Sequence, residues 1–177
     1  MSLTSSKQKM FNLPFNVPEE ELELNLMLLL ILISELSTTA RGKNILDNDR
    51  LQINFYLAQN PHTLNKLLLL LSKKQVHLKS YELASFKAEK TNIDSLYDLT
   101  ALKDYLKILI TKELVSVIHS EEIGFVYTPT GKSKILLKNL KAKYFNRIYV
   151  FIDGLKQIRS IPTSKIKNNI KIILSKG

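Results

Sequence analysis

The sequence predicts a mainly α-helical protein with one small β-hairpin wing, arranged as a winged helix-turn-helix with extra N- and C-terminal helices. Leucine-rich segments with helical spacing come first, a long amphipathic segment follows, and two short β-rich runs then lead into further helices. The 177 residues are 45% hydrophobic, which is enough for one core. We expect an N-terminal arm over residues 1–18, the winged-helix domain over 19–158 and a basic C-terminal tail over 159–177.

The first helix is predicted from Glu19 onward and contains eight consecutive apolar residues, 26–33. A bilayer span needs about 20 such residues, and the acidic residues before the run do not fit a secretory signal. We therefore expect a cytoplasmic chain with no membrane segment. The helix has almost no polar face, so it should be buried on most sides, either in its own domain or against a partner. The candidates for contact with a partner helix are Leu26, Leu29, Leu30 and Ile33.

The next segments predict two or three more helices. Residues 44–61 form the first of them, with Asp47 or Asp49 in its first turn and a stop before Pro61. The following helix takes Thr63 as its N-cap. Its apolar face consists of Leu64, Leu67, Leu68 and Leu71. Residues 80–91 hold too few apolar side chains to predict more than a short fourth helix.

The clearest amphipathic segment covers residues 94–114. Its apolar side chains recur at steps of three and four residues, at Leu99, Leu102, Leu106 and Leu109. Two β-rich runs, 114–120 and 123–128, then flank Glu121 and Glu122, which predicts a hairpin. We expect the next helix to begin with Thr128 as N-cap and Pro129 at its first position.

The C-terminal part predicts an amphipathic helix followed by a basic tail that could form a last helix. The apolar face of the helix over residues 143–158 consists of Phe145, Ile148, Ile152 and Leu155. Residues 164–177 are rich in lysine and isoleucine.

The formal charge of +10 is unevenly distributed. Residues 1–60 carry a net charge of −2, and residues 61–177 carry +12. This asymmetry favours contact with phosphates or with an acidic protein surface, although lysine-rich composition alone gives the same excess. The candidate contacts are Lys132, Lys134, Lys138, Lys141, Lys143 and Arg147. Lys134, Lys138 and Lys141 would share one helix face while leucines pack inward, but a solvated lysine face explains the pattern equally well.

The stretch TPTGKS, residues 128–133, resembles part of a phosphate-binding loop because it lies between a predicted strand and a helix. The full nucleotide motif needs a glycine five residues before Gly131, and that position is Val126. We therefore interpret the stretch as a helix cap that closes the hairpin.

The sequence contains no persuasive catalytic or metal-binding set. Cysteine is absent, and the three histidines are far apart in sequence. The carboxylates Asp94 and Asp98, or Glu121 and Glu122, come without a lysine or histidine at a spacing typical of a hydrolase. We expect no enzymatic activity and no cofactor.

Four stretches, taken in order, resemble the middle component of bacterial three-component ABC ATPase systems, a family of small winged-helix proteins. An FN-x-P-x-E entry at residues 15–20 leads into the leucine-rich helix, and residues 46–57 match a helix that ends in an aromatic-leucine pair. Residues 106–115 match the long helix that runs into the wing. Residues 125–148 match a wing exit followed by a helix and a tyrosine-containing helix.

The resemblance implies a non-enzymatic subunit that couples an ABC-type ATPase to an effector, often a nuclease, in defence against phage or other invading DNA. The implied partners are therefore the ATPase subunit and the effector subunit, with DNA as a further candidate. The alternative is a winged-helix transcriptional regulator that binds DNA as a dimer, reading bases with residues 96–113 and contacting phosphates with residues 132–147.

Overall fold

The computed structural model describes residues 22–39, 41–79, 96–140 and 143–175. It confirms a mainly helical fold with one two-stranded antiparallel hairpin, in a winged-helix-like arrangement. The elements in chain order are α1 (Leu22–Leu36), α2 (Asn48–Gln59), α3 (Pro61–Leu70), α5 (Thr100–Thr111), β1 (Val115–Ser120), β2 (Gly124–Pro129), α6 (Gly131–Lys138), α7 (Lys143–Gln157) and α8 (Thr163–Ser175). The predicted arm over residues 1–18 and the predicted helix over residues 80–91 lie outside the described residues.

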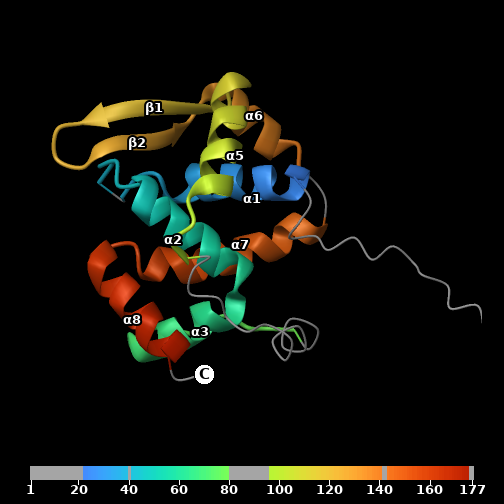
Figure 1. Ribbon diagram of the computed structural model, residues 1–177. Helices are drawn as coiled ribbons and strands as arrows, with labels where there is room; N and C mark the ends of the chain where they lie inside the picture. The colour runs from blue at the N-terminus through green and yellow to red at the C-terminus, as the bar shows by residue number, and fades with distance from the viewer. Residues whose placement is uncertain (1–21, 40, 80–95, 141–142, 176–177) are drawn as a thin grey trace, which may run out of the picture.

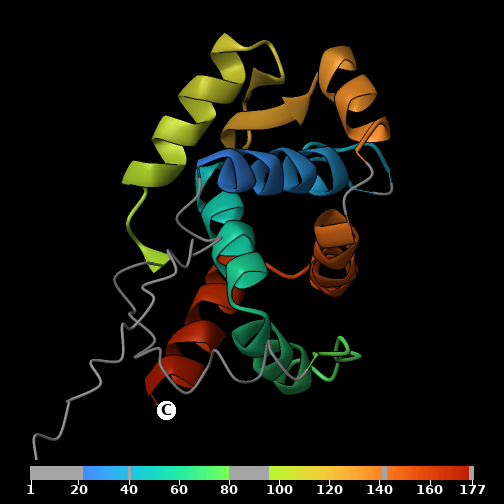
Figure 2. The same cartoon turned by 90° about the vertical axis from the view of Figure 1, so that its right-hand side faces the viewer.

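Helix α1 crosses the middle of the fold (Figures 1 and 2). It contacts α5, β2 and α6 on one side and α2 and α7 on the other. Residues 28–33 are all buried, because apolar side chains surround the helix axis and every side of it must be covered. A salt bridge of 2.8 Å between Glu35 and Lys156 ties the end of α1 to α7, and it raises the pKa of the lysine ammonium group.

This arrangement corrects one prediction from the sequence. Leu29, Leu30 and Ile33 were candidates for contact with a partner helix, but side chains of the same chain enclose them completely. A helix without a polar face looks the same in sequence whether its own domain or a partner covers it. Leu26 is only partly buried and packs against the edge of the core.

Helices α2 and α3 follow each other without a loop. Of the two predicted candidates, Asp47 caps α2: its carboxylate accepts a hydrogen bond of 2.7 Å from the backbone N–H of Arg50. Pro61 begins α3 at a position where a missing N–H costs nothing, so the prediction of Thr63 as N-cap is wrong. Thr63 lies inside the helix and is buried. The predicted apolar face is present, with Leu64, Leu67 and Leu68 fully buried.

Arg50 joins α2 to the end of α7. Its buried guanidinium donates hydrogen bonds to the carbonyl oxygens of Ile158, Arg159 and Ile161 at 2.7, 3.2 and 2.8 Å. These carbonyls lie at and after the end of α7, where a helix carries partial negative charge and leaves acceptors without internal partners. Burial lowers the pKa of Arg50, and the nearby Asp47 carboxylate opposes that shift. Arg50 is therefore a C-terminal cap for α7 that α2 supplies.

Helix α5 runs into the hairpin as predicted, although it is shorter than the amphipathic segment. Leu102, Leu106 and Leu109 are buried on its inner face. Strands β1 and β2 pair in register from Val115↔Pro129 to Ser120↔Gly124. The outer side of β2 is also occupied, because the N–H of Tyr127 donates to the carbonyl of Leu46 at 3.0 Å. The hairpin thus lies against the segment that connects α1 to α2.

The predicted basic tail is a helix of the domain. Ile166 and Ile170 of α8 are buried in the common core, and α8 packs against α3 and α2. Lys167 forms a salt bridge of 2.7 Å with Asp49 at the start of α2. Lysine and isoleucine alternate at helical spacing in this segment, so the same residues that looked like a tail form an amphipathic helix.

Replacing Leu30 by alanine should lower the free energy of unfolding of the lone chain by about 2–5 kcal/mol, because a fully buried leucine loses both its transfer energy and its packing. Leu22→Ala is the matched control in the same helix, since Leu22 is 44% exposed, and it should change stability by less than about 0.5 kcal/mol. Urea unfolding followed by circular dichroism measures both. Equal stability of the two variants would show that the chain does not cover α1 by itself in solution.

Candidate interaction surface

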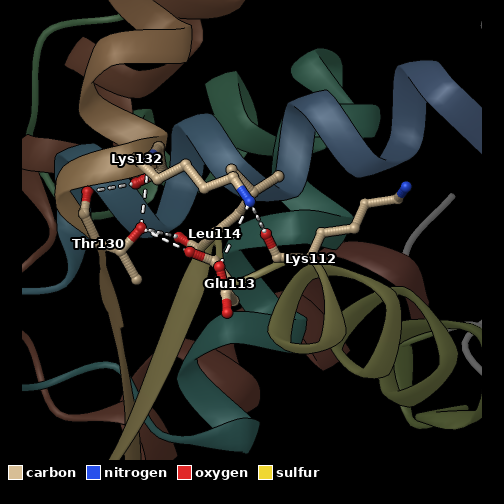
Figure 3. Close-up of polar contacts among 6 residues, drawn as sticks. Lys112, Glu113, Leu114, Thr130 and Lys132 are labelled. Atoms are coloured by element: carbon tan, nitrogen blue, oxygen red, sulfur yellow. Dashed lines mark hydrogen bonds and ion pairs between the residues drawn. The ribbon is translucent and has the colours of Figure 1, made fainter.

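The stretch TPTGKS joins the hairpin to α6 and to the end of α5 (Figure 3). The N-cap of α6 is Thr130, not Thr128 as predicted, and Pro129 is the last residue of β2. The Thr130 hydroxyl accepts a hydrogen bond of 3.2 Å from the N–H of Ser133 and donates one of 2.8 Å to the carbonyl of Glu113. One threonine therefore begins α6 and fastens it to the residue that follows α5.

The end of α5 explains why this carbonyl is available. The N–H of Glu113 bonds to the carbonyl of Ile110 and the N–H of Leu114 bonds to that of Leu109, both at 2.9 Å. This is a Schellman motif, which places Glu113 in the left-handed region at φ +59°. Lys132 donates a hydrogen bond of 3.0 Å from its ammonium group to the carbonyl of Lys112, at the negative end of α5 (Figure 3).

These contacts argue against a phosphate-binding role for the stretch. Val126, which occupies the position of the missing glycine, is fully buried in β2. Lys132 is directed at the end of α5, and the hydroxyl of Ser133 donates to the carbonyl of Thr130 at 2.8 Å. The interpretation as a helix cap fits the observed contacts, with the cap two residues later than expected.

The six predicted basic contacts do not form one stripe. Lys134 and Lys138 are exposed on α6 and lie on one helix face, whereas Lys132 is engaged at α5. Arg147 belongs to α7, donates a hydrogen bond to the carbonyl of His77 and lies 4.9 Å above the ring of Phe151. Lys141 and the side chain of Lys143 lie outside what the structure describes. Of the six predicted contacts, Lys134 and Lys138 thus form a basic pair on the exposed side of α6.

An isoleucine lies beside these two lysines on the exposed surface of α6. Ile135 is 67% exposed, and its spacing from Lys138 is one helical turn. Leu136 was expected to pack inward but is largely exposed, because Ser133, Leu137 and Leu140 form the inner face. Sequence periodicity missed this because three consecutive apolar residues, 135–137, cannot all face one side. The exposed surface of α6 therefore has a basic side, with Lys134 and Lys138, and an apolar side, with Ile135 and Leu136.

The hairpin presents a second apolar surface. Phe125 is 59% exposed, and its ring contacts that of His119 edge-on. Val117 and Ile118 of β1 are also exposed, as is Ile123 at the turn. At the turn, Glu122 forms an ion pair with Lys43, and this contact lowers the pKa of the Glu122 carboxyl group. The acidic turn is thus attached to the segment before α2.

Clusters that could hold a metal ion are not found among the described residues, which give no group of three or more histidine, aspartate or glutamate side chains at suitable distances. No helix in the described ranges is long and apolar enough to cross a membrane.

Thr130→Ala should lower the free energy of unfolding by about 0.5–2 kcal/mol, because it removes the N-cap of α6 together with the hydrogen bond to Glu113. The matched control is Thr128→Ala, two residues earlier at the end of β2, which removes neither bond. Urea unfolding of both variants measures the difference. A larger loss for Thr128→Ala would place the helix start where the sequence alone had suggested.

Comparison with known proteins identifies the family. The family model described as ABC-three component (ABC-3C) system Middle Component 4 matches residues 36–168, three quarters of the chain. No curated protein and no solved structure matches the chain. The matched region begins at the last residue of α1 and continues into α8, so it includes the hairpin, α6 and the Arg50 cap. The chain belongs to the Middle Component 4 family of ABC-three component systems, and it is therefore a component of a multi-component system.

Proposed function

We propose that this chain is a non-enzymatic cytoplasmic adaptor that links an ABC-type ATPase subunit to an effector subunit, with a nuclease as one candidate effector, in a bacterial complex that acts against phage or plasmid DNA. The observation that carries the proposal is membership of a middle-component family over residues 36–168. A middle component needs surfaces for other subunits more than it needs a catalytic centre.

The use of the polar side chains supports an adaptor role. Three polar side chains of types that often serve in functional sites cap or join helices in this fold. They are Arg50, Thr130 and Lys132. Among the described residues, exposed surfaces of mixed character include the face of α6 and the outer part of the hairpin. Surfaces that combine exposed apolar side chains with a rim of charge are typical of protein interfaces.

The face of α6 suits an acidic protein partner better than DNA. Lys134 and Lys138 supply positive charge, and α6 contains no carboxylate that would neutralise it. Ile135 beside them would stay exposed against a phosphate backbone, whereas an apolar side chain of a partner could cover it. We propose that this face contacts a subunit whose surface carries carboxylates next to an apolar patch.

A first test is purification of the tagged full-length chain after co-expression with the products of the adjacent reading frames. An ABC-type ATPase should copurify in a fixed ratio and remain bound through gel filtration. The same co-expression with an untagged chain controls for adhesion to the resin. A clean monomer without any of these products would contradict the adaptor role.

The second candidate function is that of a winged-helix transcriptional regulator that binds DNA. It is supported by the order of α5 and the hairpin, because a recognition helix precedes the wing in such proteins. Two observations weigh against it. The exposed side of α5 pairs Lys107 with Asp104 at 2.8 Å, and Glu121 and Glu122 lie at the hairpin turn, where they would repel phosphates.

Charge reversal on α6 separates the two candidates. The double variant Lys134→Glu, Lys138→Glu should weaken binding to the partner subunit about tenfold, because it removes complementary charge. Lys73→Glu with Lys74→Glu, in the exposed segment after α3, makes the same change in net charge and should leave binding unchanged. Isothermal titration measures both. Gel-shift assays with random and promoter DNA across a salt series accompany it, and sequence-specific binding by the lone chain that the α6 variant abolishes would favour the regulator.

A further inference from the structure

Strand β1 forms an edge of the hairpin to which no other described segment bonds, and the backbone pattern shows which groups lie on this edge. Residues directly opposite in an antiparallel pair alternate between exchanging hydrogen bonds and directing them outward. The N–H of Tyr127 points away from β1, toward Leu46, so its partner Val117 also directs its N–H and carbonyl outward. At the other end, the N–H of Thr130 bonds to the carbonyl of Leu114, which fixes the same alternation. His119 therefore shares the outward direction of Val117.

Nothing in the described part of the chain pairs with these outward groups of Val117 and His119. Strand β1 also lacks the features that normally protect an exposed edge. Its sequence, VSVIHS, contains no proline, lysine or carboxylate, and its pairing with β2 runs through six residues without a bulge. Val117 is 41% exposed and Ile118 is 44% exposed, so apolar side chains are available on both faces of the strand.

The edge is held in position before any partner binds. Strand β2 is attached to the rest of the fold by the hydrogen bond to Leu46 and by the Tyr127 hydroxyl, which donates to the Asn48 side chain at 2.7 Å. The ion pair between Lys43 and Glu122 fastens the turn. A preformed edge spares a partner the entropy cost of ordering the hairpin.

We propose that the free edge of β1 receives an extended strand from a partner subunit, which adds a third strand to the sheet beyond β1. The inference rests on the proposed adaptor function. Only an extended polypeptide matches a row of alternating donors and acceptors, and its alternate side chains would pack on Val117 and His119, which share one face of β1. A second copy of this chain is the less suitable occupant, since two chains of formal charge +10 repel each other. The incoming strand therefore belongs to another subunit and carries an apolar side chain at the position that faces Val117.

The test compares Val117→Pro with Val117→Thr in the full-length chain. Proline removes the outward N–H and its ring blocks an incoming strand, while the hydrogen bonds to β2 remain, so the hairpin should fold. Threonine keeps the N–H and the β-branched shape. Titration against the copurified ATPase or effector subunit should show binding at least about tenfold weaker for Val117→Pro and within about twofold of wild type for Val117→Thr.

Hydrogen exchange of the wild-type chain gives an independent reading. The amides of Val117 and His119 should exchange rapidly in the lone chain and become protected in the complex, while those of Ser116 and Ile118 are protected in both. Protection of Val117 and His119 only in the complex supports the proposal even if Val117→Pro fails to fold.

The remaining outcomes distinguish failure of the proposed adaptor function from failure of the strand-addition proposal. Absence of any copurifying subunit overturns the adaptor function together with this inference. Copurification with no protection of these amides, or with equal binding by Val117→Pro, overturns the inference alone. Equal losses for both variants would assign the effect to the side chain and overturn strand addition. A dimer of the lone chain that Val117→Pro converts to a monomer would assign the edge to a second copy instead.

Discussion

The lack of a polar face on α1 is the constraint on which the rest of the fold depends. A helix with one apolar stripe can lie on the surface of a domain, but residues 28–33 surround the axis of α1 with leucine and isoleucine, so water must be excluded from every side. Two groups of elements are needed to do this. Helices α2 and α7 cover one side, and α5, β2 and α6 cover the other. The position of the hairpin is therefore a consequence of covering α1.

Much of the fold could be predicted from local patterns. Helical periodicity identified the inner face of α5 through Leu102, Leu106 and Leu109, and the acidic turn between two β-rich runs identified the hairpin. Helix ends were less predictable, because several residues near each end could serve as caps. Thr63 and Thr128 both have suitable side chains, but Pro61 and Thr130 begin the helices. The choice depends on what each residue contacts in the folded chain, and sequence spacing does not contain that information.

The candidate surface was harder to predict for the same reason. Lys132 reaches a carbonyl 20 residues earlier in the chain, and Arg147 reaches one 70 residues earlier. In both contacts, a basic side chain that was predicted to bind phosphates or an acidic surface instead bonds to a backbone carbonyl of the same chain. The apolar side chains of Leu29, Leu30 and Ile33 could be predicted to be buried, but their sequence does not show whether the same chain or another subunit buries them. The same chain does so. Long-range contacts thus decided which of the predicted site residues remain accessible.

The two edges of the hairpin differ because of α1. Strand β2 packs on α1 and bonds to the segment before α2, so its Val126 and Tyr127 are buried and the outward N–H of Tyr127 is used. Strand β1 extends from α5 on the far side of β2, where none of the described elements pairs with its outer edge. Covering α1 thus requires the hairpin to lie with β2 inward, and the same orientation turns β1 outward. The proposed adaptor role needs a surface that is rigid before another subunit binds. Strand β1 meets this condition, because β2 holds it in place on one side while no described segment bonds to its other side.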